Sequence, residues 1–315
     1  MNDAATPGPT RTPLQPAQWA RTLVYLGGHD RDAIARVADA HPDAMCIDLE
    51  DSTPLDAKEA GRANLGWVAD LLAASGVAMH VRVNAGSQQA VDLAACAEVG
   101  VHCLNLPKVE SAEMVHEFEE RIAATGGRLA AGDRAVWIRP VIETPLGVRN
   151  AFEIAAASPL VAYMGGVEGG IYGDLGGALG YEQTADGSET FYLRSRVLLD
   201  VRAAQIPFPI GGGTTSRRDV DGQVEFALAN RALGYSGMHC MADPDVVRAV
   251  NAALTPTTEY LKNLVELVAR LEEVERSGAH VAHLDGRVYD LVALERLREQ
   301  LALGRRLGLV DEAVA

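Results

Sequence analysis

The chain has few positive charges for its size, and this shortage excludes one broad class of partner. Its 315 residues include 28 Lys and Arg against 43 Asp and Glu, a formal net charge of −15. A protein that binds nucleic acid or an anionic membrane surface needs a basic excess to displace counterions from phosphates. We therefore expect neither partner. A phosphate-bearing small molecule held by a few local cations stays compatible with this charge.

Long apolar runs and closely spaced cysteines are also missing. No run approaches the roughly 20 residues that a membrane-spanning helix needs, and residues 1–18 lack the apolar segment of a secretion signal. Those residues are rich in Pro, Thr and Ala, and we expect a disordered arm. The four cysteines lie far apart with no Cys-x-x-Cys spacing. Buried thiols in a cytoplasmic protein are therefore expected, rather than disulfides or a zinc site.

Eight short apolar segments alternate with helical segments between residues 19 and 254. The predicted strands cover residues 22–26, 44–50, 77–84, 101–106, 136–143, 160–164, 208–210 and 237–241. Such alternation is typical of parallel β–α–β units, and eight units predict an α/β fold of the (β/α)8 barrel type. A doubly wound open sheet is the alternative, although its GxGxxG fingerprint is absent after the first strand. Residues 255–315 predict a C-terminal helical extension that packs on the barrel or on a neighbouring subunit.

Charged residues follow these strands, at the end where α/β barrels carry their active sites. They are Asp48, Glu50 and Asp51 after the second strand, Arg82 in the third, Lys108 after the fourth and Glu143 after the fifth. An acid at the end of a buried strand is costly to ionise unless a cation meets it. We therefore expect a cationic partner for Glu143.

A second acid, Asp174, follows the sixth strand in a glycine-rich stretch. Glu143 and Asp174 on successive strand ends suit Mg²⁺, which takes one or two protein carboxylates and leaves other positions to water and substrate. Arg82 can offer a planar pair of donors to a carboxylate or carbonyl oxygen. Glycines such as Gly173 let backbone N–H groups approach an anion. These groups together predict a site that binds a 2-oxo acid and stabilises an enolate or alkoxide.

Short motifs spread along the chain resemble the HpcH/HpaI aldolase and citrate lyase β-subunit family. They are RTLVYLGG at 21–28, IDLEDSTP at 47–54, VRVNA at 81–85, LPKVESAE at 106–113, VIETPLGV at 141–148, RSRVLLDVRAA at 194–204, VNAALTP at 250–256 and LDGRVYD at 284–290. The resemblance covers essentially the whole chain after residue 20, in order. It implies a Mg²⁺-dependent barrel that makes or breaks a carbon–carbon bond beside a 2-oxo acid, often with a coenzyme A thioester.

The resemblance also implies roles for individual residues. Glu143 is a metal ligand and Arg82 the substrate-binding, catalytic arginine. Asp48, Glu50 and Asp51 are acids around the metal and its waters.

Three further residues take roles from the resemblance. Asp290 matches an acid that reaches a neighbouring subunit's site and exchanges a proton with the thioester's α-carbon, so a homotrimer or homohexamer is expected. Lys58 and Arg21 match positions near the thioester's phosphates. Ordinary surface cations are the alternative interpretation of Lys58 and Arg21.

The chain departs from the family pattern at the second metal ligand. Gly169 stands where the family has an aspartate, and we interpret Asp174 as that ligand after about five extra residues, with Glu168 as the alternative. Asp243 replaces a family histidine, and IGGGTTSRRD replaces a bulkier turn after the seventh strand. These changes lie on the rim where an acyl or coenzyme portion would pass, so coenzyme A use stays open.

The sequence therefore predicts a Mg²⁺-dependent carbon–carbon lyase or synthase that acts on a β-hydroxyacyl-CoA or a 2-oxo acid. Three alternatives remain: an aldolase of free 2-oxo acids, an acyl-CoA thioester hydrolase, and a non-catalytic relative.

Overall fold

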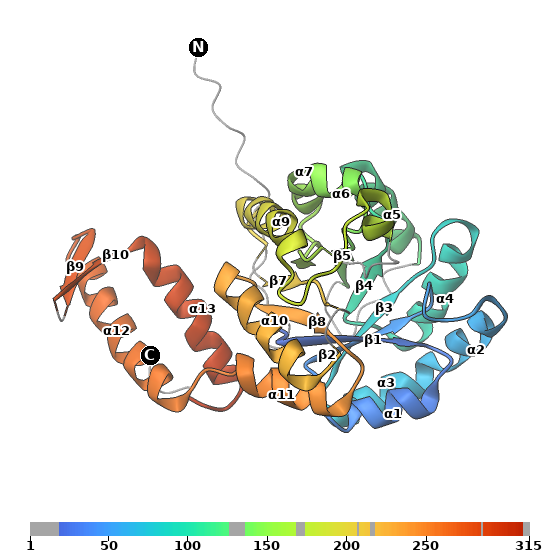
Figure 1. Ribbon diagram of the computed structural model, residues 1–315, viewed down its shortest axis with the longest axis horizontal. Helices are drawn as coiled ribbons and strands as arrows, with labels where there is room; N and C mark the ends of the chain where they lie inside the picture. The colour runs from blue at the N-terminus through green and yellow to red at the C-terminus, as the bar shows by residue number, and fades with distance from the viewer. Residues whose placement is uncertain are drawn as a thin grey trace, which may run out of the picture. The chain divides into compact units, whose positions relative to one another are not determined.

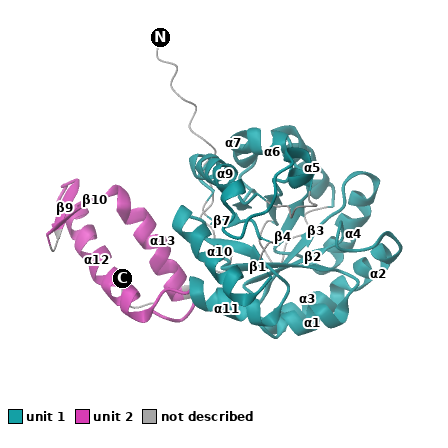
Figure 2. Ribbon diagram, viewed as in Figure 1, with its two compact units in different colours: residues 1–14, 20–254 teal, residues 15–19, 255–315 magenta. Residues whose placement is uncertain are grey.

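The computed structural model describes residues 19–125, 136–167, 174–206, 208–214, 218–284 and 286–310. The predicted N-terminal arm, Glu168 and Gly173 lie outside these residues. The chain divides into two compact units, which Figure 2 distinguishes by colour. Unit 1 contains residues 20–254, and unit 2 contains the chain from Thr255 onward.

Unit 1 is a parallel β-barrel surrounded by helices (Figure 1). Its strands are β1 (Thr22–Gly27), β2 (Ala44–Asp48), β3 (Ala78–Arg82), β4 (Cys103–Leu106), β5 (Trp137–Pro140), β6 (Tyr163–Met164), β7 (Phe208–Gly211) and β8 (Gly237–Cys240). They lie in the order β5-β4-β3-β2-β1-β8-β7-β6. A parallel bridge between Ile138 and Val161 joins the two ends of this order and closes the barrel. The predicted (β/α)8 barrel is confirmed, and the open sheet is excluded.

Pro140 is tolerated in β5 because the N–H group that proline lacks would point toward β6, and only a single bridge joins β5 to that side. The amide of Trp137 donates to His102, just before β4, and that of Val141 donates to Leu106 at the end of β4, whereas the amide of Ile138 donates to Leu160 before β6. Pro140 shares the direction of Ile138, since donors alternate along a strand. The side of β5 that lacks a donor is therefore the side that forms only a single bridge.

The helices of unit 1 follow the strands closely, and two of the helical stretches are broken at one residue each. The elements are α1 (Arg31–Ala38), η2 (Leu55–Ala57), α2 (Lys58–Ala63), α3 (Leu65–Ser75), η3 (Gly86–Gln88), α4 (Gln89–Val99), α5 (Ala112–Ala124), α6 (Pro145–Arg149), α7 (Ala151–Ala156), α8 (Asp174–Leu179), η4 (Ser188–Thr190), α9 (Phe191–Ala203), α10 (Val220–Leu233) and α11 (Pro244–Leu254). The breaks fall at Asn64 and Asn150. Each side-chain amide donates to a carbonyl in an adjacent loop, Gly28 at 2.9 Å and Glu110 at 2.8 Å.

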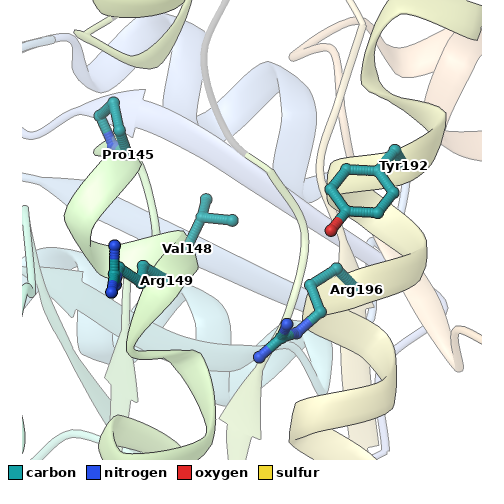
Figure 3. A pocket seen from close by; sticks show the side chains of 5 residues that line it. All are labelled: Pro145, Val148, Arg149, Tyr192 and Arg196. Atoms are coloured by element: carbon teal, nitrogen blue, oxygen red, sulfur yellow. The ribbon is translucent and has the colours of Figure 1, made fainter.

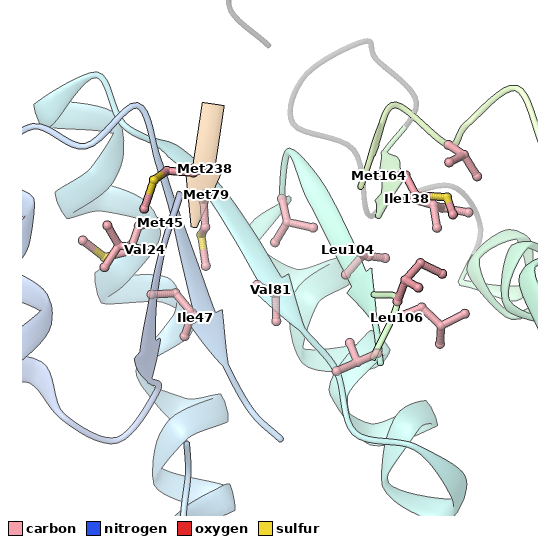
Figure 4. Packing of buried hydrophobic residues seen from close by; sticks show 14 of the residues in the cluster. Val24, Met45, Ile47, Met79, Val81, Leu104, Leu106, Ile138, Met164 and Met238 are labelled. Atoms are coloured by element: carbon pink, nitrogen blue, oxygen red, sulfur yellow. The ribbon is translucent and has the colours of Figure 1, made fainter. Parts of the chain in front are cut away.

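The apolar core of unit 1 lies between the barrel and its helices. Side chains alternate across a strand, and those facing the helices are apolar. Figure 4 shows Val24, Met45, Ile47, Met79, Val81, Leu104, Leu106, Ile138, Met164 and Met238, all buried in one cluster. Because these positions are buried, every second residue of a strand segment is apolar.

The intervening side chains fill the barrel interior and are largely polar. The hydroxyl of Tyr25 accepts hydrogen bonds from Asn105, at 2.8 Å, and from the fully buried Arg139. Burial, together with the charge of Arg139, lowers the pKa of His80 to about 3, so its imidazole is neutral. Cys46 and Cys103 lie among these residues, and all four cysteines are buried with free thiols, as predicted. The interior thus supports the charged residues at the strand ends with a polar layer.

Unit 2 contains α12 (Thr258–Arg276), β9 (Val281–Leu284), β10 (Arg287–Asp290) and α13 (Val292–Arg306). The two helices pack through Leu261, Leu264, Val268, Leu271, Leu294 and Leu301. The predicted C-terminal helical extension is present as α12 and α13, and the segment between them forms an antiparallel hairpin of β9 and β10 that was not predicted. The signal was present in Asp285-Gly286, a dipeptide typical of two-residue hairpin turns. In the described part of the chain, no helix is both long and apolar enough to cross a membrane.

Gly147 in α6 packs against the loop that follows β4. A Cβ at Gly147 would lie 2.4 Å from the carbonyl oxygen of Val109, so α6 approaches this loop as closely as a glycine allows. Lys108 precedes Val109, and Glu143 lies four residues before Gly147. The contact therefore sets how closely two charged residues of the barrel rim approach each other.

We predict that Gly147→Ala lowers the free energy of unfolding by about 1–3 kcal/mol, the usual cost of overpacking. Gly177→Ala is the matched control, because Gly177 is also helical and a Cβ there meets no atom within 4 Å. That substitution should be neutral or stabilise by up to about 1 kcal/mol. Urea unfolding measures both. Equal stability of the two variants would contradict the close contact at Gly147.

Candidate active site

Arg82 and Asp48 form a buried pair at the carboxyl ends of adjacent strands. β2 and β3 pair in parallel with Asp48 opposite Arg82, so both side chains enter the barrel at the same level. The Arg82 guanidinium donates from Nε to Asp48 Oδ1 at 2.8 Å and from Nη2 to Oδ2 at 2.6 Å. This two-point contact fixes the plane of the guanidinium as well as its position.

Asp48 is held in its ionised form by the groups around it. Its carboxylate also accepts backbone N–H groups of Glu50, at 2.9 Å, and Ser52, at 2.8 Å. Burial raises the pKa of Asp48, but the hydrogen bonds and charge of Arg82 outweigh that effect, and Ser52 adds to them, so the pKa lies below its usual value. The negative charge that orients Arg82 is therefore present at neutral pH.

The remaining nitrogen of Arg82 faces two more carboxylates. Nη1 lies 3.0 Å from Glu50 Oε2 and 3.9 Å from Glu143 Oε2. The guanidinium lies over the Tyr25 ring, with Cζ 5.2 Å from the ring centroid. Glu143 thus meets the cation that its burial requires. Burial raises the pKa of Glu50, and the charge of Arg82 only partly offsets this.

Lys108 brings a second cation to the same acids. Its Nζ lies 3.1 Å from Asp174 Oδ2, 3.3 Å from Glu50 Oε1 and 3.9 Å from Asp51 Oδ2. Its backbone N–H donates to Glu143 Oε1 at 2.8 Å. Partial burial lowers the pKa of Lys108, but the hydrogen bond to Asp174 and the neighbouring acids outweigh it and raise the pKa. The sequence identified Lys108 as a strand-end cation and as a candidate cation for coenzyme A, so its contact with Asp174 and Glu143 is a finding of the structure.

Lys58 lies beside this cluster but is engaged with the barrel itself. Its Nζ donates to the carbonyl oxygens of Leu49, at 2.6 Å, and Glu50, at 2.5 Å, and to Asn84 Oδ1 at 2.9 Å. These contacts hold the loop after β2 in place. They identify Lys58 as a residue that positions Glu50.

A buried network of hydrogen bonds holds the chain just after β3, and the sequence did not reveal it. Asp92, fully buried in α4, accepts the backbone N–H of Asn84 at 2.7 Å and its side-chain amide at 2.8 Å. Arg62 donates to the second oxygen of Asp92 at 2.7 Å. Asn84 follows β3 by two residues, so this network anchors the strand end that carries Arg82.

The charges at this rim fit a divalent cation. The charged side chains described here are the acids Asp48, Glu50, Asp51, Glu143 and Asp174 and the cations Arg82, Lys108 and Lys58. Five carboxylates against three cations leave two formal negative charges, and hard carboxylate oxygens are the ligands that Mg²⁺ prefers. Among the described residues no group of three or more His, Cys, Asp or Glu side chains is arranged to hold an ion.

Arg21, Gly173 and Asp290 are described separately from this cluster. Arg21 precedes β1 and pairs with Asp43, which precedes β2, at 2.8 Å, so it lies at the amino ends of the strands. The structure does not bring Arg21 to the rim, and we leave it out of the proposed site. Gly173 lies outside the described residues. Asp290 ends β10 in unit 2, where its exposed carboxylate accepts the N–H of Val292 at 3.0 Å.

The described glycines near the sixth and seventh strands serve close packing. A Cβ at Gly166 would lie 2.3 Å from the amide nitrogen of Gly212, and a Cβ at Gly212 would lie 2.3 Å from the carbonyl oxygen of Val167. The ends of β6 and β7 therefore touch through their backbones. This contact accounts for glycine at both positions without a ligand.

A groove borders the rim between α6 and α9. Its volume is about 490 Å³, and its lining is Pro145, Val148, Arg149, Tyr192 and Arg196. Figure 3 shows the Tyr192 hydroxyl and the Arg196 guanidinium directed from α9 toward α6. The groove contains none of the predicted site residues, although α6 begins two residues after Glu143.

A closed parallel barrel with an arginine held among carboxylates at its carboxyl end defines an α/β-barrel enzyme. The HpcH/HpaI aldolase/citrate lyase family model matches residues 21–243. The chain belongs to that family, as its motifs indicated, and is an enzyme of the carbon–carbon lyase class.

Individual relatives match nearly the full length of the chain. Citrate lyase subunit beta of Leuconostoc mesenteroides subsp. cremoris is 26% identical over 294 residues, which cover 92% of this chain and 95% of that protein. (3S)-malyl-CoA thioesterase of Cereibacter sphaeroides is 27% identical over 284 residues, with 90% and 93% covered. A crystal structure of protein CitE from Mycobacterium tuberculosis in complex with magnesium, acetoacetate and coenzyme A has a TM-score of 0.64 and 25% identity, and the match covers 93% of this chain and 99% of that one.

We predict that Asp48→Asn lowers the free energy of unfolding at pH 7 by about 3–5 kcal/mol, because it leaves the Arg82 charge buried without its partner. Asp48 has a lowered pKa, so its stabilising effect is present above the unfolded-state pKa of about 3.9 and is lost as pH falls through the folded-state value. The difference between wild type and variant should therefore shrink below about pH 4. Urea unfolding at pH 7 and pH 3 tests this, and a difference that grows toward pH 3 would refute it.

Proposed function

We propose that this protein is a Mg²⁺-dependent carbon–carbon lyase or synthase that acts on a β-hydroxyacyl-CoA or a 2-oxo acid. The observation that carries the proposal is the Arg82 guanidinium, fixed by Asp48 and directed at Glu50 and Glu143 at the carboxyl end of the barrel. A cation oriented by one carboxylate and surrounded by others can bind a substrate oxygen without first reorganising.

Glu143 and Asp174 would hold the metal ion, with water and the substrate's carboxylate in the other positions. Bound there, Mg²⁺ would polarise the substrate's oxygens as a Lewis acid. Both acids contact Lys108, Glu143 through the backbone N–H and Asp174 through Nζ, so the structure supports their use by one ion. Glu50 and Asp51 contact the same ammonium and would receive the metal's water ligands.

Arg82 would bind the oxygen on which charge develops. In the cleavage direction this is the hydroxyl oxygen, whose proton would pass to a carboxylate of the rim while the carbon–carbon bonding pair leaves with the thioester enolate and the keto group forms. Nη1 would be the donor to it, because Nε and Nη2 are already bonded to Asp48. Nη1 carries two N–H groups, so it can bind the substrate oxygen beside Glu50, which lies 3.0 Å away. A preorganised donor of this kind typically contributes about 3–4 kcal/mol to transition-state stabilisation.

Asp290 would protonate the α-carbon of the departing thioester enolate from a neighbouring copy of the chain. Its carboxylate is exposed on the hairpin of unit 2, which supports this role. A homotrimer or homohexamer would bring it to the partner's rim. The Mycobacterium tuberculosis protein crystallised with coenzyme A supports a thioester co-substrate.

A thioester hydrolase is the second candidate, and the similarity to (3S)-malyl-CoA thioesterase favours it specifically. Product analysis with malyl-CoA and citramalyl-CoA distinguishes the two. We predict a new 2-oxo acid and a shorter acyl-CoA, which only carbon–carbon cleavage yields. Free coenzyme A with an intact hydroxy acid would show hydrolysis instead. If neither thioester is cleaved but a free 2-oxo acid condenses with an aldehyde, the aldolase alternative holds.

We predict that Glu143→Gln and Asp174→Asn each weaken Mg²⁺ binding by at least about tenfold, because each removes a charged ligand. Isothermal titration of metal-free protein with MgCl₂ measures the dissociation constant directly. Asp70→Asn, an exposed residue of α3, is the matched control and should bind as the wild type does. Unchanged affinity in both rim variants would place the metal elsewhere and refute the assignment.

A further inference from the structure

Lys108 is held at the rim by its backbone, independently of its side chain. Its φ is +52°, a left-handed value that side-chain-bearing residues rarely adopt. In this conformation its N–H donates to Glu143 Oε1 at 2.8 Å, while its Nζ lies among Glu50, Asp51 and Asp174. One residue therefore contacts both proposed metal ligands, one through each end.

The ammonium group and a metal ion would use the same oxygens. Asp174 Oδ2 lies 3.1 Å from Nζ and is the closest of its three acidic contacts. Two cations held on one carboxylate at such distances repel each other. The Lys108 side chain is 38% exposed, so it has solvent into which it can swing while its backbone stays bonded to Glu143.

We propose that the Lys108 ammonium is the counter-ion of the metal-free site and that it must release Asp174 when the divalent ion binds. The proposal rests on the proposed function, since it takes Asp174 as a metal ligand. It makes Lys108 a positioning residue with two effects. It keeps the acids together when no metal is present, and it sets the metal affinity by competing for Asp174.

Titration of metal-free protein with MgCl₂ tests the competition. Lys108→Met should bind Mg²⁺ about tenfold more tightly than the wild type, and its metal-free form should melt at a lower temperature, because the acids then repel each other without a counter-ion. Lys108→Arg keeps the charge and should bind within about threefold of the wild type. Lys262→Met removes the same charge from an exposed position of α12 and should change neither quantity.

The outcomes separate this inference from the proposed function. A wild type that binds Mg²⁺ together with a Lys108→Met variant of equal or weaker affinity overturns the competition and leaves the metal site standing. A wild type that binds no Mg²⁺ overturns both.

A measurement on the wild-type protein tests the proposal even if the Lys108→Met variant fails to fold. Acetylation of the Lys108 amine, followed by mass spectrometry, should be faster with saturating Mg²⁺ than without it. A slower or unchanged rate overturns the proposal.

Discussion

The pairing of Asp48 with Arg82 is the constraint on which the rest of the rim depends. The pair forms because β2 and β3 align these residues in register, and it binds two of the three guanidinium nitrogens. The third nitrogen then faces Glu50 and Glu143. Without the pair, a buried arginine would need another partner, and the acids on neighbouring strands would lose the cation that they now face.

Polar side chains inside the barrel help to hold this pair in place. Tyr25 lies under the Arg82 guanidinium and accepts hydrogen bonds from Asn105 and Arg139, so side chains of the first, third, fourth and fifth strands meet at one phenol. The apolar core lies on the other side of the strands, against the helices. The fold therefore separates two tasks. Helix packing provides stability, while the interior orients charge at the carboxyl end.

The sequence predicted the barrel because its information was local. Apolar segments typical of strands alternate with helical segments eight times. The helix breaks at Asn64 and Asn150 leave this alternation unchanged. The acids and Arg82 were also predictable, since each ends or follows a strand. The side-chain partners of the charged residues were harder to predict, because these contacts depend on strand register and loop conformation. Arg21 finds Asp43 at the opposite end of the strands, and Lys108 reaches Asp174 from a left-handed backbone that its sequence does not signal.

A crystal structure of the protein with Mg²⁺ and oxaloacetate tests the central claim most directly. The account predicts an ion bonded to Glu143 and Asp174, a substrate oxygen within hydrogen-bond distance of Arg82 Nη1, and an intact pair between Arg82 and Asp48. It would be contradicted by a bound substrate that contacts neither Arg82 nor the ion, or by acids that keep only lysine and arginine partners while saturating Mg²⁺ binds elsewhere.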